Sequence, residues 1–411
     1  MRITLVHQYY LAPDEPGISR FNEMARVWTA AGHEVSVIAG TVSLSTGRTH
    51  PGTARRLVTR TTDGPVVVWR AHVPSTYSKN YLGRRFAYAV FTLTASLAAL
   101  RSGPTDVVIA TSPPLVVVIP GWIKATLGRV PWIFEVRDLW PESAVTTGVA
   151  SARSPLTRFL YWLERASCRR AARVVALTQA IADDIVRRGL APASRLAVIP
   201  NAADLRLFAP ASRDNAFRRE QGFGERIVVM YTGAHGRANA LGQLLDAGEA
   251  LRDRGDIVIA LVGDGQQRAA LEAEARRRRL ANVVFCGPQP KERMAECVNA
   301  ADICLAVLQR NPTFRTVYPN KVFDYMACAR PIVLAIDGAA RALVCDEAEA
   351  GLYAEPEDGH AIADAIRALA DDAELRRRLG ENGRIWVQEH ASRERLAAHY
   401  LEMLEGLVTH R

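Results

Sequence analysis

Residues 227–265 read IVVMYTGAHGRANALGQLLDAGEALRDRGDIVIALVGDG, and this stretch decides the fold. Two apolar runs, Ile227–Tyr231 and Ile257–Val262, flank a helical pattern over about Leu241–Arg254. A glycine-bearing loop follows each apolar run, as is common where a strand leads into a helix. Strand, glycine loop, helix and strand together predict a βαβ unit of a parallel sheet.

The same alternation continues on both sides of this unit. Further strands are expected after it at Val283–Cys286, Ile303–Val307 and Ile332–Ala335. Before it, a helix is expected over Ser19–Ala31 and strands at Arg2–Val6, Glu34–Ala39, Val66–Trp69, Val107–Ala110, Ile133–Val136, Val174–Leu177 and Leu196–Ile199. Apolar strands separated by helices predict parallel sheets that are covered on both faces.

The alternation is interrupted over residues 200–215, which are rich in turn-forming residues and lack periodicity. The chain therefore predicts two doubly wound α/β domains. A long amphipathic helical pattern over about Arg384–Val408 has no strand after it, so it either closes the second domain or crosses back to the first. In such folds ligands bind at the carboxyl ends of the strands, which predicts a site in a cleft between the domains.

Composition narrows the class of partner. The 411 residues are 49% hydrophobic and 23% charged, with a net charge of +9, which favours phosphates, anionic lipids or nucleic acid. No nucleic-acid-binding motif accompanies the charge, so nucleic acid is not expected. Six scattered Cys without a CxxC pair predict a reducing compartment and no structural metal. Without a signal peptide or a run of about 20 apolar residues, we expect a cytoplasmic protein.

Two apolar segments, residues 86–100 and 115–134, are flanked by basic residues such as Arg101 and Arg129. An interfacial membrane helix has this composition, and so does a helix buried against the first sheet. We favour the buried helix and keep peripheral contact with the inner membrane face as the alternative.

Two loops of the first domain contain candidate acceptor residues. Gly17 lies at a helix start, where backbone amides bind phosphate or a polar acceptor, although it could simply mark a turn. No G-x-G-x-x-G pattern accompanies it. The second loop crowds Glu135, Arg137, Asp138 and Trp140 together at a strand end. Asp138 could orient or deprotonate a hydroxyl and Trp140 could stack on a sugar; an ion-paired loop is the structural alternative.

The second domain offers three candidate loops. In the first, Gly233 would bring the backbone near a ligand, and His235 and Arg237 could supply charge. In the second, Asp264 either accepts hydrogen bonds from a base or ribose or shapes the turn.

The third loop, residues 315–327, carries the clearest pattern. Its Pro-Asn step at Asn320 predicts a helix start with free amides. Lys321, one of only four Lys in the chain, lies in the first turn, where the helix dipole disfavours a cation unless an anion is bound. Asp324, one turn on, could hold ribose hydroxyls.

Taken together, the order and spacing of these motifs resemble the retaining glycosyltransferases of the GT-B group, family 4. Within that family the chain is similar to bacterial surface-polysaccharide enzymes that transfer N-acetylhexosamines. The resemblance covers nearly the whole chain and rests on RITLVHQYYLAPDEPGISRF, AAGHEVSVI, EVRDLWPES, VIPNAAD, YTGAHG, VGDG and PNKVFDYMACARPIV.

The resemblance implies a domain organisation and a reaction. Residues 1–207, joined by the C-terminal helix 388–411, would hold the acceptor, and residues 208–387 would hold the sugar nucleotide. The expected reaction is transfer of N-acetylglucosamine or a related sugar from a UDP-sugar to a polyprenyl-linked or polysaccharide-precursor acceptor, with no metal or other cofactor. A soluble secondary-metabolite acceptor, a sugar-nucleotide 2-epimerase and a nucleotide-sugar sensor are the alternatives.

The expected roles follow the domains. Catalytic roles go to Asp138, Arg237 and Lys321; donor contacts to Gly233, His235, Asp264, Lys291, Asn320 and Asp324; acceptor contacts to Gly17, Glu135, Arg137 and Trp140. The chain departs from the family at three places: Thr316 stands eight residues before Asp324 where relatives often have a glutamate, no Lys follows Arg237 closely, and Asp138 stands where many relatives have a His. Lys321 or Lys291 would supply the second positive charge.

Overall fold

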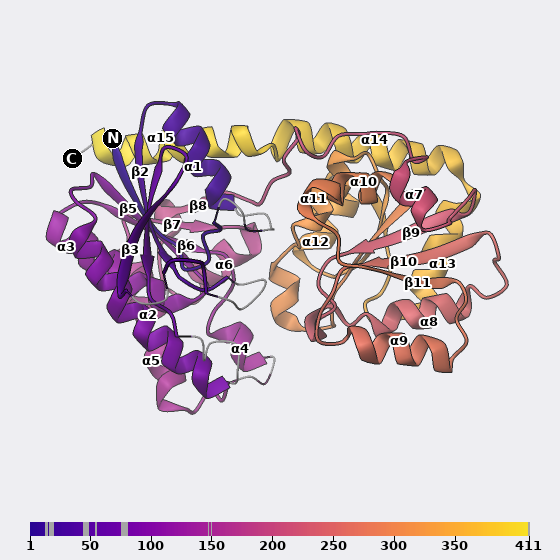
Figure 1. The fold of residues 1–411 in the computed structure, drawn as a ribbon, viewed down its shortest axis with the longest axis horizontal. Helices are drawn as coiled ribbons and strands as arrows, with labels where there is room; N and C mark the ends of the chain where they lie inside the picture. Colours follow the sequence, from indigo (N-terminus) through magenta and orange to yellow (C-terminus); the bar gives the residue numbers. More distant parts are fainter. Residues whose placement is uncertain are drawn as a thin grey trace. The chain divides into compact units, whose positions relative to one another are not determined.

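The structure, a computed structural model, describes residues 1–12, 15, 20–43, 49–53, 56–74, 81–146, 148 and 150–409. The chain divides into two compact units (Figure 1). Unit 1 comprises Met1–Pro200 and Glu394–Arg411, and unit 2 comprises Asn201–Arg393. The boundaries expected from the sequence, after residues 207 and 387, both fall inside unit 2, near its ends.

Unit 1 is built on an eight-stranded sheet in the order β3-β4-β2-β1-β5-β6-β7-β8. The strands are β1 (Arg2–Val6), β2 (Glu34–Gly40), β3 (Val58–Asp63), β4 (Val66–Ala71), β5 (Val107–Ser112), β6 (Trp132–Val136), β7 (Arg173–Ala176) and β8 (Leu196–Val198). Neighbours are parallel except β3 and β4, which form an antiparallel hairpin. The sequence did not predict β3, because its VTRTTD run is polar and largely exposed at the edge of the sheet.

Helices flank this sheet: α1 (Arg20–Ala30), α2 (Tyr81–Arg101), α3 (Val118–Gly128), α4 (Glu142–Thr146), α5 (Pro155–Arg170), α6 (Gln179–Arg187) and α15 (Arg393–Thr409). The apolar segment 86–100 lies within α2, whereas residues 115–134 are not one helix, because they continue from α3 into β6.

The C-terminal helix α15 packs on α1 within unit 1. The Trp28 indole Nε1 donates to the Ala397 carbonyl at 2.9 Å, and the Tyr400 ring lies 5.5 Å from the Trp28 ring and 6.3 Å from the Phe21 ring, centroid to centroid. The single long helix expected over Arg384–Val408 is wrong. Helix α14 (Ala373–His390) ends before Ala391, and α15 starts anew three residues on.

Unit 2 is built on a six-stranded parallel sheet in the order β11-β10-β9-β12-β13-β14. Its strands are β9 (Ile227–Thr232), β10 (Ile257–Val262), β11 (Val283–Gly287), β12 (Ile303–Val307), β13 (Ile332–Ala335) and β14 (Gly351–Tyr353). The expected strands are confirmed, and β14 is an addition too short to stand out in the sequence.

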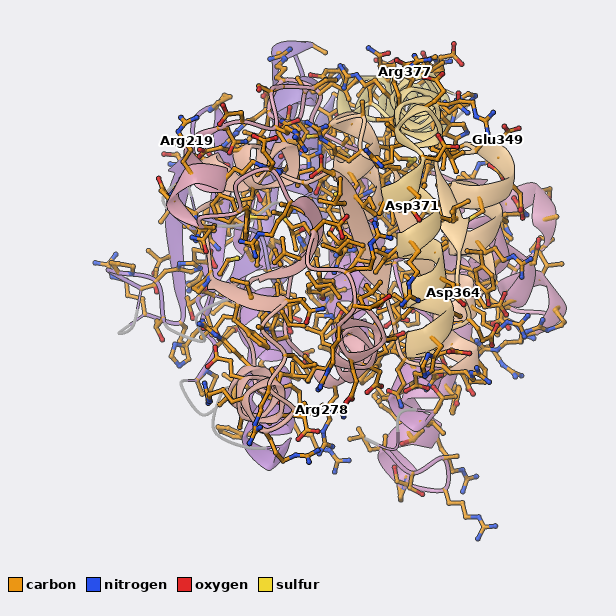
Figure 2. All side chains as sticks on the ribbon, turned by 90° about the vertical axis from the view of Figure 1, so that its right-hand side faces the viewer. Arg219, Arg278, Glu349, Asp364, Asp371 and Arg377 are labelled. Carbon is orange, nitrogen blue, oxygen red and sulfur yellow. The ribbon has the colours of Figure 1, made fainter. Side chains whose placement is uncertain are left out.

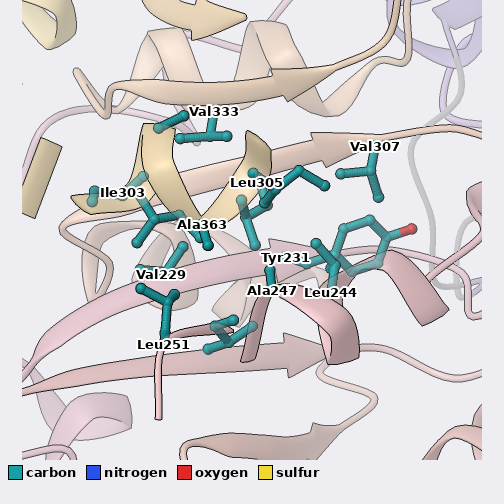
Figure 3. Close-up of a cluster of buried hydrophobic side chains, with 14 of the residues drawn as sticks. Val229, Tyr231, Leu244, Ala247, Leu251, Ile303, Leu305, Val307, Val333 and Ala363 are labelled. Carbon is teal, nitrogen blue, oxygen red and sulfur yellow. The ribbon is translucent and has the colours of Figure 1, made fainter. Parts of the chain in front are cut away.

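The helices of unit 2 are α7 (Ala216–Glu220), α8 (Gly242–Ala250), α9 (Arg268–Arg277), α10 (Met294–Asn299), α11 (Lys321–Ala327), α12 (Ala339–Arg341), α13 (Gly359–Asp371) and α14. Between the sheet and helices α8 and α13 lies a buried apolar cluster that includes Val229, Leu244, Leu305 and Ala363 (Figure 3). Tyr231 belongs to this cluster and donates its hydroxyl to the Ala234 carbonyl at 2.9 Å. The core therefore supports the loop that follows β9.

Candidate donor and acceptor sites

Two glycine loops meet at the carboxyl ends of β9 and β10. The amide of Gly233 donates to the Val262 carbonyl at 2.9 Å, and the amide of His235 donates to the Asp264 carbonyl at 2.8 Å. Gly263 has φ +140°, and a Cβ built on it would lie 1.9 Å from the Gly233 carbonyl oxygen. Only glycine permits this close approach of the two backbones, so the loops pack together because Gly233 and Gly263 have no side chains.

This packing corrects one expectation. The Gly233 amide is already bonded to Val262, so it is not a free donor for a diphosphate. In contrast, the amides of Ala234, Gly236 and Arg237 donate to no backbone carbonyl within the described part of the chain. These are the amides through which this loop can bind an anion.

Lys321 lies directly against this loop. Its Nζ is 3.6 Å from the centroid of the Tyr231 ring, and a Cβ added to Gly233 would lie 2.9 Å from the same Nζ. The absence of a side chain at Gly233 therefore leaves room for the ammonium group. Burial lowers the pKa of Lys321 to about 7. A bound anion would favour the charged form and raise this pKa.

Helix α11 is tied to the end of β9 through Tyr325. The buried Tyr325 hydroxyl accepts a hydrogen bond from the Thr232 amide at 2.9 Å. Asn320 precedes the helix as predicted; it is exposed, and its side chain makes no capping hydrogen bond. The structure thus brings Gly233, Lys321 and the first turn of α11 together, and Asp324 follows within the same helix.

His235 is not suited to supply the positive charge expected of it, whereas its contact with the donor stays a prediction. Its side chain is fully buried, and neither ring nitrogen has a hydrogen-bond partner among the described residues. Burial, followed by the positive charge of Arg268, lowers the pKa of His235. The imidazole is therefore neutral at neutral pH and supplies no positive charge, because its buried position opposes protonation.

The remaining donor candidates lie at the same edge of the sheet. Arg237 is exposed in a 3-10 turn, Arg237–Asn239, that leads toward α8. Asp264 is exposed and its Oδ1 accepts from the Gly265 amide at 2.8 Å, an arrangement that shapes the turn. Lys291 opens another 3-10 turn, Lys291–Arg293, beyond the end of β11.

The acceptor candidates of unit 1 differ strongly in exposure. Glu135 lies inside β6, fully buried, and not in the loop as expected. Its Oε1 is 3.5 Å from Arg20 Nε and accepts from Thr111 Oγ1 at 3.3 Å. Pairing with Arg20 offsets part of the cost of burying the charge of Glu135 and links α1 to β6. The contact of Glu135 with an acceptor stays a prediction.

Arg137, Asp138 and Trp140 follow the end of β6 and are partly buried. Asp138 Oδ2 accepts from Ser143 Oγ at 3.1 Å, and burial raises the pKa of Asp138. Burial also lowers the pKa of Arg137. A carboxylate held in this way is suited to accept a proton from a hydroxyl. The expected contact at Gly17 lies outside the described residues.

Sequence reasoning missed His7 and Gln8, which follow β1. Both are buried, and His7 Nδ1 and Gln8 Oε1 have no partner in the part of the chain that the structure describes. Burial, and then the charges of Arg137 and Arg70, hold the pKa of His7 well below its usual value. Their position directly after an apolar strand was the available signal, since ligands bind at that end of parallel strands.

Among the described residues, no group of three or more His, Cys, Asp or Glu side chains is placed to hold a metal ion. In the described part of the chain, no helix is both long enough and apolar enough to cross a bilayer.

Comparison with known proteins identifies the class. Residues 17–202 match the family model described as glycosyl transferase 4-like domain, and residues 226–372 match glycosyl transferases group 1. The fold and these two matches define a GT-B glycosyltransferase. The chain belongs to family 4 of that group, as its sequence motifs predicted.

Individual relatives are distant. The chain is 24% identical to the putative colanic acid biosynthesis glycosyl transferase WcaI of Escherichia coli K12, over 88% of this chain and 91% of that protein. It is 28% identical to the alpha-D-kanosaminyltransferase of Streptomyces kanamyceticus, over 54% of this chain and 57% of that protein. HepE of Anabaena, solved in complex with UDP-glucose, shares the fold with a TM-score of 0.71 and 18% identity, over 99% of this chain and all of that one.

Proposed function

We propose that this enzyme transfers N-acetylglucosamine or a related N-acetylhexosamine from a UDP-sugar to a polyprenyl-linked or polysaccharide-precursor acceptor. The observation that carries the donor assignment is the position of Lys321 Nζ, which lies against both Gly233 and the Tyr231 ring at the carboxyl ends of the unit 2 strands. The complex of HepE with UDP-glucose supports a uridine nucleotide. The match to WcaI, over nearly the whole of both chains, supports a polysaccharide precursor.

In this proposal the chain's own groups stabilise the departing diphosphate. The Lys321 ammonium, Arg237 and the amides of Ala234 and Gly236 provide positive charge and donors, so the reaction proceeds without a metal ion. The bond from the anomeric carbon to the diphosphate breaks and a bond to the acceptor oxygen forms on the same face. Asp138 orients the acceptor hydroxyl, whose proton passes to the leaving diphosphate.

The product of the reaction tests this function. The enzyme is incubated with radiolabelled UDP-N-acetylglucosamine and a lipid extract, and the anomeric configuration of the isolated product is determined by NMR. We expect a labelled lipid-linked product with the donor's configuration. An inverted anomer would contradict the mechanism, and an unlabelled lipid fraction would contradict the acceptor.

A soluble secondary-metabolite acceptor is the second candidate, favoured by the match to the kanosaminyltransferase. The same incubation with a cytosolic extract separates the two, because label then enters the aqueous fraction. A sugar-nucleotide 2-epimerase would instead consume the donor when no acceptor is present. We further propose a cytoplasmic location, which the six free cysteines support.

A further inference from the structure

Three helices of unit 1 expose large apolar side chains. On α2, Phe86, Leu93 and Leu100 are 59%, 73% and 58% exposed, and their seven-residue spacing places them on one face of the helix. Leu127 of α3 is 67% exposed. On α5, exposed Phe159 and Trp162 stack with ring centroids 5.7 Å apart. Large exposed apolar side chains that gather in one patch, with polar residues around them, mark a surface that binds a partner or a membrane.

Helices α2, α3 and α5 are neighbours in unit 1 (Figure 1). Helix α3 packs against α2, and its buried Lys124 Nζ donates to the Ala99 carbonyl of α2 at 3.0 Å. Helix α5 contacts α3 through the Arg170 guanidinium, which lies 4.6 Å from the centroid of the Trp122 ring. We call the exposed surface of α2, α3 and α5 the apolar-basic face.

The charge of this face has one sign. Within α2, α3 and α5 the only carboxylate is Glu164, which is buried and paired with Arg188. The exposed charged residues of the described side chains there are all basic, at Arg101, Arg158, Arg165, Arg169 and Arg170. On the surface of unit 2, by contrast, several arginines pair with carboxylates.

Arg278 and Arg377, both labelled in Figure 2, are two such arginines. Arg278 pairs with Asp246 and Glu274, and Arg377 pairs with Glu374 and Glu381. Charges neutralised in this way attract no external anion at long range. The arginines of the apolar-basic face have no such carboxylates on their own helices, so the face presents a net positive field beside apolar side chains.

We propose that the apolar-basic face docks on the surface of an anionic lipid bilayer. Apolar side chains such as Leu93 and Trp162 enter the boundary between headgroups and acyl chains, while the arginines bind lipid phosphates. A second copy of the chain fits this face poorly, because a two-fold symmetric contact would place the arginines of one copy against the same arginines of the other. The inference goes beyond the proposed function, because it concerns binding to a membrane without any substrate.

Sedimentation with vesicles tests the proposal. The full chain is mixed with phosphatidylcholine vesicles with or without phosphatidylglycerol, and the pelleted fraction is measured at low and high salt. We expect pelleting with phosphatidylglycerol that weakens at high salt. Leu93→Glu should weaken partitioning at least about tenfold, since one inserted Leu contributes on the order of 1.5–3 kcal/mol. The matched control is Ile385→Glu on α14, which exchanges a 53% exposed apolar residue of unit 2.

A second pair of variants tests the charge independently of the apolar side chains. Arg165→Glu with Arg169→Glu should reduce pelleting, whereas Arg378→Glu on α14 should leave it unchanged. Failure of the wild type to pellet with phosphatidylglycerol, or equal pelleting by Leu93→Glu and Ile385→Glu, would overturn the proposal. So would a dimer in gel filtration that Leu93→Glu disperses without changing vesicle binding. Because the vesicles hold no donor or acceptor, such a failure leaves the proposed function standing.

Discussion

Lys321 is the residue at which stability and function oppose each other most clearly. Burial lowers its pKa from 10.5 to about 7, so below pH 7 the folded chain holds a disfavoured charge. Between pH 7 and 10.5 the unfolded chain binds a proton that the folded chain lacks, and stability rises with pH. Lys321→Met should therefore raise the free energy of unfolding at pH 7, and this gain should fade towards pH 10.5. Urea unfolding of both proteins at pH 7 and pH 10.5 measures this gain. A gain that does not depend on pH would contradict the lowered pKa of Lys321.

Asp138 should set the acidic limit of activity. Its pKa is raised by burial, so its carboxylate is lost at a higher pH than that of an exposed aspartate, and kcat should fall as the pH drops through this value. Asp138→Asn should lower kcat at least about tenfold, because the amide orients the acceptor hydroxyl less strongly than the carboxylate does, and should remove this acidic limb. A pH profile of kcat checks this, with the exposed Asp183→Asn as control; a wild-type profile in Asp138→Asn would exclude the role.

For single residues, the sequence predicted the position within a helix or loop better than it predicted which side chains lie nearby. It placed Asn320 and Lys321 at a helix start, because the Pro-Asn step is a local signal. It did not predict the Tyr231 ring beside Lys321, since that contact joins residues distant in the chain. For the same reason it assigned charge to His235, whose burial depends on the packing of three separate segments.

The contact between the two glycine loops is the element that shapes the donor site. Gly263→Ala would place a methyl group on the Gly233 carbonyl at an unfavourable φ. We expect a loss of about 2–4 kcal/mol in unfolding free energy and weaker UDP binding. Gly255→Ala is the matched control, because a Cβ there meets nothing within 4 Å. Equal melting temperatures for the two variants would show that the loops tolerate separation.

Helix α15 is the element that completes unit 1. Tyr400 is fully buried against Phe21 and Trp28, so Tyr400→Ala should cost about 3–5 kcal/mol, in the range for large aromatic truncations. The exposed Glu402→Ala is the control, and calorimetric melting is the measurement. A melting temperature unchanged by Tyr400→Ala would mean that α15 contributes little to the unit.

The burial of a strand or helix decides whether the sequence alone predicts it. The buried parallel strands are continuous apolar runs, and the expected strands were all found. The edge strand β3 is polar and β14 spans three residues, so neither has a periodic signal. The break between α14 and α15 was missed, because the amphipathic pattern continues through it.

For the whole molecule, the order of motifs predicted the two α/β units and the glycosyltransferase family. Family membership does not specify the acceptor, since the chain matches both a colanic acid biosynthesis enzyme and a kanosaminyltransferase. The same limit applies to the apolar-basic face. The sequence showed apolar helices with basic flanks, but which faces of α2 and α5 remain exposed is a property of the folded unit.

Calorimetric titration of UDP into the wild type and Lys321→Met tests the central claim, that unit 2 binds a uridine diphosphate through Lys321 and the loop after β9. We predict that the wild type binds UDP more tightly than GDP or TDP, with affinity falling as the pH rises above about 7, and that Lys321→Met binds at least about tenfold more weakly at pH 7. Equal UDP affinity in the two proteins, or a preference for GDP, would contradict the account.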